Sequence, residues 1–167
     1  RMCFERHATS KIRTAEDIFK IRTKGFRGEA MASIAAIAQV ELKTRLPQEE
    51  IGNRIVIEGS DIISQEQVQC APGSNISVKN LFYNVPARRN FLKSNTVELK
   101  HIIDEFERVV LAHPGIFFSL QNNGIELFHL KPGNYRQRVI HLFGSNYNEK
   151  LVPIEENTSV ANIRGFI

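Results

Sequence analysis

Residues 25–34 are Gly25-Phe26-Arg27-Gly28-Glu29-Ala30-Met31-Ala32-Ser33-Ile34, with two glycines around an arginine and strong helix formers directly after them. Apolar residues then recur at helical spacing, which predicts a helix from Glu29 to about Ala38. The first turn of a helix has unpaired N–H groups and the positive end of the macrodipole, and both attract anions. Glycines let the backbone approach such an anion closely, and Arg27 adds a planar cationic group. The stretch therefore predicts a phosphate-binding clamp at Gly25–Gly28.

A plain loop is the alternative for these residues, because Gly-x-x-Gly also closes loops before helices and leaves the arginine in solvent. The sequence contains neither the Gly-x-x-x-x-Gly-Lys-Ser/Thr motif of P-loop proteins nor a Gly-x-Gly-x-x-Gly motif after a strand. If the clamp holds phosphate, it does so within another fold.

The composition is that of a globular chain with a real core, since 42% of its 167 residues are hydrophobic. No apolar run approaches ~18 residues and no leader segment is visible, so we expect no membrane contact and a cytoplasmic, intracellular location. The net charge is +4, but residues 1–27 hold eight basic residues against three acidic ones. This excess favours a polyanionic ligand or nucleic acid, although a charge run is also commonly a solvated face.

The two cysteines and five histidines give no sign of a metal site or a catalytic nucleophile. Cys3 and Cys70 lie far apart without a zinc-ligand spacing, so we expect free thiols, and the histidines lack metal-ligand spacing as well. The chain begins and ends abruptly within patterned segments. We therefore expect a piece of a longer protein.

The remaining patterns predict a mixed arrangement of helices and strands. Thr14 and Asp17 form a capping-box pattern before a short helix to about Ile21, with Ile18 and Ile21 as its apolar face. Alternating residues predict four strands, at about 40–45, 54–58, 67–70 and 76–78. These strands are followed by a long helix at about 96–113 and by a hairpin of strands 116–121 and 125–130. The last predicted elements are a helix at 135–143 and strands at about 151–155 and 160–167. Lys131-Pro132-Gly133 is the predicted domain boundary.

A second unusual stretch runs from Leu81 to Lys93 and combines aromatic with basic residues. Its proline, Pro86, suits the first turn of a short helix, which would gather Arg88, Arg89 and Lys93 on one side and turn Phe91 and Leu92 inward. Such a basic cluster beside aromatics is typical of nucleic-acid contact. The alternative is that the aromatics are core residues and the arginines are simply exposed.

Three stretches of the sequence together resemble successive motifs of one family. They are Arg6-His7-Ala8-Thr9-Ser10-Lys11-Ile12, Gly25-Phe26-Arg27-Gly28-Glu29-Ala30, and Gly73-Ser74 followed by Leu81-Phe82-Tyr83-Asn84-Val85-Pro86-Ala87-Arg88-Arg89. In order and spacing they resemble the MutL DNA mismatch-repair proteins of the GHKL ATPase superfamily, and the resemblance covers the whole chain. One Gly-x-x-Gly is weak evidence, whereas the three motifs in order are very specific.

The resemblance implies a set of site residues. The first motif would be the flexible lid over ATP, with Thr9, Ser10 and Lys11 at the nucleotide phosphates, and the second would contact the triphosphate through Gly25, Phe26, Arg27 and Gly28. Ser74 stands where the family usually has threonine beside the adenine pocket. Arg88, Arg89 and Lys93 lie in or just after the loop that the family associates with ATP-driven dimerisation and DNA contact.

The resemblance also implies a fold and a function for the longer protein. The expected fold is a two-layer α/β (α+β) sandwich of the GHKL type, with a mixed, mostly antiparallel sheet, helices on one face and an incomplete N-terminal side. Residues 1–132 would form this partial ATPase domain, and residues 133–167 would begin a second, transducer-like domain. The longer protein would bind ATP with Mg2+, hydrolyse it slowly and form a homodimer on DNA. Its further partners would be a MutS-type mismatch-recognition protein and downstream repair enzymes.

This chain lacks the family's general-base glutamate, its magnesium-binding asparagine and its Asp-x-Gly-x-Gly motif, which are expected upstream. We therefore expect no catalytic residue in this chain, no activity of the chain alone and no cofactor bound to it alone. The alternative from another class is a non-catalytic nucleic-acid-binding module, in which the Gly-x-x-Gly loop clamps a nucleic-acid backbone as in KH domains. A purely structural interaction domain is a third alternative.

Overall fold

The structure, a computed structural model, describes residues 1–167 and divides them into two compact units. The first unit is Arg1–Leu92 and the second is Lys93–Ile167. The domain boundary expected after Pro132 lies within the second unit and stays a prediction. Each unit is described below by itself.

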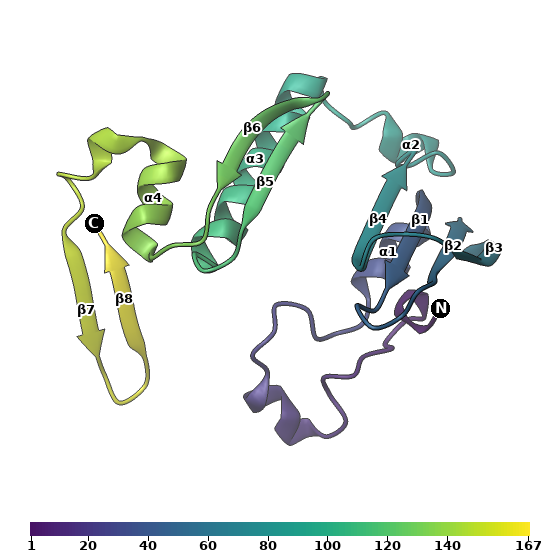
Figure 1. Cartoon of the computed structure of the whole chain (residues 1–167), viewed down its shortest axis with the longest axis horizontal. Coiled ribbons are helices and arrows are strands. Elements are labelled where there is room, and N and C mark those ends of the chain that lie inside the picture. Colours follow the sequence, from purple (N-terminus) through teal and green to yellow (C-terminus); the bar gives the residue numbers. More distant parts are fainter. The chain divides into compact units, whose positions relative to one another are not determined.

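The first unit is built on a four-stranded sheet in the order β3-β2-β1-β4, and all its neighbouring strands are antiparallel (Figure 1). The strands are β1 (Gln39–Arg45), β2 (Gly52–Glu58), β3 (Asp61–Val68) and β4 (Gly73–Lys79). Alternation in the sequence gives the sheet one apolar face, on which Val40 lies between Ile57 of β2 and Val78 of β4. Residues 46–51 connect β1 to β2.

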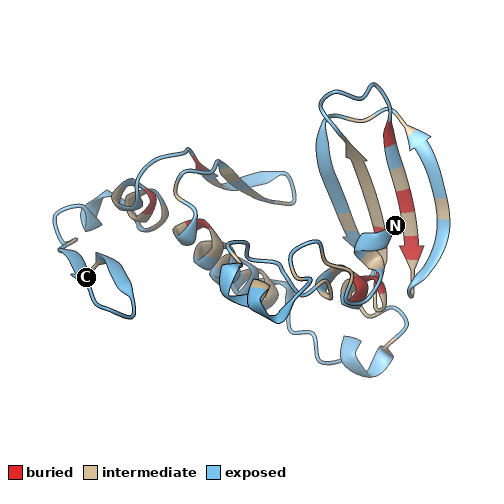
Figure 2. Ribbon diagram, turned by 90° about the horizontal axis from the view of Figure 1, so that it is seen from below, coloured by how far each residue is buried: buried red, intermediate tan, exposed pale blue.

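Helix α1 (Ala30–Ala35) packs on the apolar face and creates the core of the unit. The core residues are Ala35, Ala38, Val40, Ile55 and Ile57. Figure 2 shows the buried residues of this unit gathered on α1 and the neighbouring strands. The small alanine side chains allow the helix to approach the sheet closely. The helix is shorter than the predicted span to about Ala38, because loops from elsewhere take the carbonyl groups at its end, as described below.

Two short helical segments of the first unit differ from the expectation in their burial. The segment η2 (Ala15–Lys20) has the predicted capping pattern, since the Asp17 carboxylate accepts hydrogen bonds from the N–H groups of Arg13 and Thr14, both 3.0 Å long. These bonds lower the pKa of Asp17 below its ordinary value. However, Ile18 is 54% exposed, so the predicted apolar face is wrong there. The segment is a 3-10 helix, whose tighter winding presents no continuous α-helical stripe to the core.

The stretch after β4 contains the expected short helix, α2 (Pro86–Arg89), with Pro86 at its first position. Phe91 is 77% exposed, so the expectation that Phe91 and Leu92 turn inward is wrong. Helix α2 has only four residues and ends before it can form a buried stripe along which these two side chains would pack.

The second unit begins with the longest helix, α3 (Asn95–Ala112), followed by the hairpin of β5 (Phe118–Asn122) and β6 (Ile125–Leu130). Asn123 and Gly124 occupy the turn with positive φ values, as the Asn-Gly signal predicts. Phe106 of α3 packs against Phe118 and Phe128 of the hairpin, with ring centroids 6.2 and 5.5 Å apart. The helix therefore covers one face of the hairpin.

The remainder of the second unit is α4 (Tyr135–Phe143), η3 (Ser145–Tyr147), β7 (Pro153–Asn157) and β8 (Asn162–Phe166). Asn134 and Gln137 form a capping box at the start of α4. Arg138 of α4 is 1% exposed, and its Nη2 donates to the carbonyl oxygens of Pro114 (2.8 Å) and Ile116 (2.6 Å). Through Arg138, α4 is joined to the segment that leads into β5.

The chain thus has the expected mixed α/β architecture with an antiparallel sheet and helices. None of its helices combines the length and the apolar character that a membrane crossing requires.

Candidate functional site

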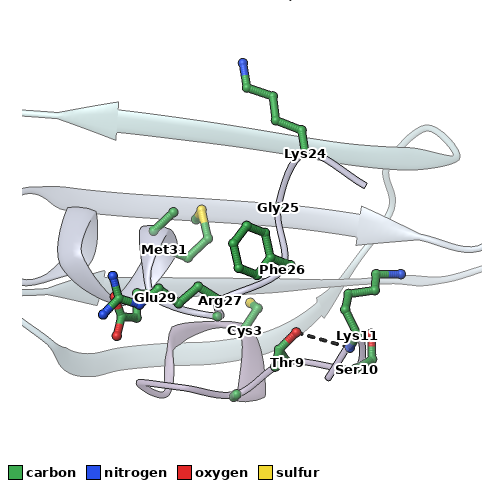
Figure 3. A pocket seen from close by; sticks show the side chains of 13 residues that line it. Cys3, Thr9, Ser10, Lys11, Lys24, Gly25, Phe26, Arg27, Glu29 and Met31 are labelled. Carbon is green, nitrogen blue, oxygen red and sulfur yellow. Dashed lines mark hydrogen bonds and ion pairs between the residues drawn. The ribbon is translucent and has the colours of Figure 1, made fainter. Parts of the chain in front are cut away.

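A cavity of about 550 Å³ in the first unit lies between two segments that are separated by 13 positions in the sequence (Figure 3). One is residues 8–11, here called the lid, and the other is residues 25–28, here called the clamp. The cavity is lined by Cys3, Ala8, Thr9, Ser10, Lys11, Lys24, Gly25, Phe26, Arg27, Gly28, Glu29, Ala30 and Met31. The fold therefore brings together all seven nucleotide-contact residues predicted in the lid and the clamp.

The lid is an irregular segment that a threonine side chain organises. The hydroxyl oxygen of Thr9 accepts a hydrogen bond from the Lys11 N–H group, with a distance of 3.1 Å, drawn as a dashed line in Figure 3. This local bond folds the lid back on itself, which is a common role of threonine in turns. Ser10 and Lys11 are exposed, so their polar groups are accessible to a ligand.

The clamp touches the lid through the backbone of Gly28. Gly28 has φ +70°, and a Cβ at this position would lie 2.4 Å from the carbonyl oxygen of Ala8. Only glycine permits both the left-handed conformation and this close approach. Gly25 is different, because a Cβ there would meet no atom within 4 Å. Of the two clamp glycines, Gly28 is thus the one that the geometry requires.

A carboxylate also joins the lid side of the cavity to the clamp. Glu29 accepts from His7 Nδ1 with one oxygen and from Arg27 Nε with the other, and both distances are 3.0 Å. The side chains of His7 and Arg27 are 73% and 75% exposed, so each pair contributes little stability by itself. In the structure, the bridge places the Arg27 side chain beside Glu29.

The electrostatic balance of the cavity is positive. Lys11, Lys24 and Arg27 line it, and Glu29 is the single carboxylate among the lining residues. Phe26 and Met31 supply apolar surface beside these charges, and Lys24 extends away from the Phe26 ring in Figure 3. A cavity with an excess of cations and with accessible hydroxyl groups is suited to an anionic ligand.

Ser74, the eighth predicted nucleotide contact, lies elsewhere. It borders a separate cavity of about 320 Å³ with Lys43 and Cys70, and its hydroxyl oxygen is 3.0 Å from that of Thr44. The fold does not bring Ser74 into the cavity of the lid and the clamp. A contact between Ser74 and a nucleotide base stays a prediction.

The predicted DNA-contact residues are divided between the two units. Arg88 and Arg89 are both exposed on α2 in the first unit. Lys93 is the first residue of the second unit, where its backbone N–H donates to the Glu98 carboxylate over 2.8 Å. The structure thus places two of the three cations on one short helix.

Sequence reasoning missed the contacts at the C-terminal end of α1. The carbonyl oxygens of Ala35, Ala36 and Ile37 accept hydrogen bonds from Ser60 N–H (3.0 Å), Asn84 Nδ2 (2.9 Å) and Phe82 N–H (2.7 Å). It also missed Glu29, although a lone carboxylate directly after the clamp, in a segment rich in cations, was the available signal. The contacts at the helix end join residues that are between 25 and 48 positions apart in the sequence, and no local pattern predicts them.

The known proteins that are most useful for comparison with this chain are DNA mismatch-repair proteins. The chain is 62% identical over all 167 residues to the DNA mismatch repair protein MutL of Flavobacterium psychrophilum, and 56% identical to that of Bacteroides fragilis. It covers 27% of the length of each of these relatives. The Aquifex aeolicus MutL ATPase domain complexed with ADP has a TM-score of 0.70 and 27% identity, covering 86% of this chain and 56% of that one. No protein-family model matches the chain.

The fold is that of a GHKL-type ATPase domain, as indicated by the antiparallel sheet, the helix that covers it, the lid and the clamp. More narrowly, the chain belongs to the MutL family of DNA mismatch-repair proteins, as the three sequence motifs predicted. The chain spans about a quarter of the length of these relatives. The activity of the longer protein is therefore given below as a proposal.

Proposed function

We propose that the cavity between the lid and the clamp binds the phosphate groups of ATP. The observation that carries this proposal is that seven predicted residues, from two segments separated by 13 positions, line one positively charged cavity. A polyphosphate requires cations, hydroxyl groups and accessible backbone N–H groups, and the cavity has residues of each kind. The Aquifex aeolicus MutL ATPase domain was solved with ADP, which supports a nucleotide as the ligand.

The residues present do not form a magnesium site. No group of three or more His, Cys, Asp or Glu side chains is gathered anywhere in the structure. Glu29, the carboxylate at the cavity, is already paired with His7 and Arg27. Magnesium prefers several oxygen ligands in octahedral geometry, so we assign no step to Mg2+ on these residues. In the longer protein we propose that Mg2+ binds together with ATP through residues outside this chain.

Hydrolysis is proposed for the longer protein and not for this chain by itself. The lid and the clamp offer phosphate contacts, but a general base needs an unpaired group positioned beside the attacking water. Glu29 does not meet this requirement, because both of its oxygens are engaged. The chain's own contribution is to bind and orient the phosphates.

We further propose that the longer protein works on DNA inside the cell, as a mismatch-repair protein. Arg88, Arg89 and Lys93 are the proposed DNA contacts, because exposed arginines and lysines bind phosphate oxygens without reading sequence. ATP binding would favour a homodimer, and a MutS-type protein and downstream repair enzymes would be its partners. Residues 133–167 are proposed to begin the second domain.

Calorimetric titration of the full-length protein with a non-hydrolysable ATP analogue tests the central part of the proposal. Lys11→Ala and Arg27→Ala should each weaken binding by about tenfold, a loss of about 1.4 kcal/mol. Lys79→Ala is the matched control, since this exposed lysine of β4 lies outside the cavity, and it should bind as the wild type does. No nucleotide binding, together with salt-dependent DNA binding that ignores ATP, would instead favour a non-catalytic nucleic-acid module.

A further inference from the structure

Residues 12–24 join the lid to the clamp and are here called the connecting loop. Figure 1 shows this loop, drawn in purple, extending away from the four-stranded sheet of the first unit. Its helical segment, η2, contains no buried residue, and no residue of the loop belongs to the core of the unit. The connecting loop is therefore a surface feature whose side chains are accessible to a partner.

The basic residues from the lid to the clamp form two sets. One set lines the cavity described above and consists of Lys11, Lys24 and Arg27. The other set lies outside that cavity, is fully exposed and consists of Arg13, Lys20 and Arg22. None of the residues in this second set forms an ion pair. The cavity thus accounts for only part of the positive charge, and the connecting loop presents the rest to solvent.

The two acidic residues of the connecting loop are directed at its backbone and not at these cations. The carboxylate of Asp17 accepts hydrogen bonds from the N–H groups of Arg13 and Thr14, at the start of η2. Hydrogen bonds from its own backbone N–H and then from the Thr14 side chain lower the pKa of Glu16. Both carboxylates therefore serve the N-terminal end of η2, where unpaired N–H groups attract anions. The cations that follow η2 are left without an acidic partner.

An exposed aromatic side chain stands directly beside these cations. Phe19 is 91% exposed, and it is followed immediately by Lys20 and three positions later by Arg22. A phenylalanine as exposed as this one contributes little to the stability of the fold, because it buries almost no apolar area. Proteins that bind single-stranded nucleic acid combine the same groups, since cations bind the phosphates and aromatic rings stack on unpaired bases.

We propose that the connecting loop binds single-stranded DNA, with Phe19 stacked on a base and with Lys20 and Arg22 bound to the flanking phosphates. Duplex DNA suits the cations equally well, but it offers Phe19 no open base without the cost of unstacking a step. This surface is additional to the contacts proposed for Arg88 and Arg89. The inference rests on the proposed function, because that function makes DNA a ligand of the protein.

Fluorescence anisotropy of the full-length protein, without nucleotide, measures its affinity for a labelled single strand and for the duplex of the same sequence. Phe19→Ala should weaken binding of the single strand by about fivefold or more and leave duplex binding within about twofold. Phe19→Tyr keeps an aromatic ring and should retain the wild-type affinity for both forms.

The cations are tested by the salt dependence of single-strand binding. Each phosphate contact contributes about 0.7 to the slope of log affinity against log salt concentration, so Lys20→Ala combined with Arg22→Ala should reduce this slope by about 1.4. Phe19→Ala should leave the slope unchanged, because the ring carries no charge. The two variants therefore report stacking and phosphate contact separately.

Two exposed residues of the second unit supply matched controls. Val160→Ala removes an apolar side chain that is 92% exposed in the turn between β7 and β8. Lys100→Ala removes an exposed lysine of α3 that forms no ion pair. Both variants should keep the single-strand affinity within about twofold and the wild-type salt slope. The variants of the connecting loop should bind a non-hydrolysable ATP analogue within about threefold of the wild type, because their residues lie outside the cavity.

Wild-type single-strand affinity and salt slope in both connecting-loop variants would overturn the inference and leave the proposed function intact. Equal losses for single strand and duplex in Phe19→Ala would also overturn it, because the ring would then not be stacked on an open base. Weaker binding of the ATP analogue at unchanged thermal stability would assign Phe19 to the nucleotide and not to DNA. If the wild type binds neither form of DNA, the DNA part of the proposed function itself fails. The charge variant tests the same surface if Phe19→Ala lowers the thermal stability.

Discussion

At the scale of single residues, Gly28 carries the contact between the lid and the clamp. Gly28→Ala would place a methyl group 2.4 Å from the Ala8 carbonyl oxygen in a backbone conformation that alanine disfavours. We expect the free energy of unfolding to fall by more than about 1 kcal/mol and nucleotide affinity to fall by about tenfold or more, because the lid must move away. Thermal denaturation and calorimetric titration measure the two effects.

Gly25→Ala is the matched control in the same loop, because its Cβ would meet no atom within 4 Å and its φ is not in the left-handed region. This variant should keep its stability within about 0.5 kcal/mol of the wild type. Equal losses of stability in the two glycine variants would show that loop flexibility matters here, and not the approach of Gly28 to Ala8.

Arg138 is the second residue whose surroundings lead to a prediction. Its Nη2 satisfies carbonyl groups of Pro114, Ile116 and, at 3.4 Å, Lys131, and its guanidinium lies 5.5 Å from the Phe118 ring centroid. Burial lowers the pKa of this guanidinium, and its Nε and Nη1 have no partner. Arg138→Met keeps the apolar stem but leaves the carbonyl groups unsatisfied.

We expect Arg138→Met to lower the free energy of unfolding of the chain by about 1–3 kcal/mol in urea denaturation, since the orphaned carbonyls outweigh the relief of the buried charge. Arg108→Met provides the comparison, because that arginine is exposed and pairs only with Glu105 on the surface of α3. A more stable Arg138→Met variant would mean that the buried charge is the dominant effect.

At the scale of secondary-structure elements, a network of charges crosses the outer face of the sheet. Glu41 of β1 accepts from Arg54 of β2 and lies 3.1 Å from Lys43, while Arg54 also reaches Glu66 of β3. The hydrogen bonds from Arg54 and then Lys43 lower the pKa of Glu41 from 4.5 to about 2. Cross-strand pairs of opposite charge stabilise the register of neighbouring strands.

The pH dependence follows from the direction of this shift. Because folding lowers the pKa of Glu41, its contribution is fully present above about pH 4.5 and is lost as the pH falls towards about 2. Glu41→Gln should therefore reduce the slope of stability against pH within that window, measured by urea denaturation. Glu58→Gln is the control, because the Glu58 carboxylate of β2 forms no ion pair, and this variant should retain the wild-type slope of stability against pH.

The elements themselves were largely predictable, because their signals are local. Alternation along Val40–Arg45 and the Asn-Gly turn at 123–124 each specify a structure from neighbouring residues. The end of α1 and the exposure of Phe91 were not predictable, since they depend on loops distant in sequence and on the length of a four-residue helix. Periodicity indicates which face of a helix is apolar, but it does not tell whether another element covers that face.

At the scale of the whole molecule, the sequence predicted the lid and the clamp as one site, and the fold brings them together. That prediction came from the resemblance of the two motifs to the MutL family, whereas the clamp residues alone predicted only a phosphate-binding loop. The bridge from Glu29 to His7 and Arg27 depends on side-chain placement across 22 positions, and its only signal in the sequence is the lone carboxylate directly after the clamp. Ser74 was expected near the nucleotide, and its place in a separate cavity leaves that role as a prediction.

Hydrogen exchange of the full-length protein, with and without a non-hydrolysable ATP analogue, tests the central claim most directly. If the lid and the clamp together bind the phosphates, amides in residues 8–11 and 25–29 should become protected at the same analogue concentration. Amides of the hairpin β7–β8 should not change. Binding of the analogue with protection confined to other segments, or with only one of these two segments protected, would contradict the account.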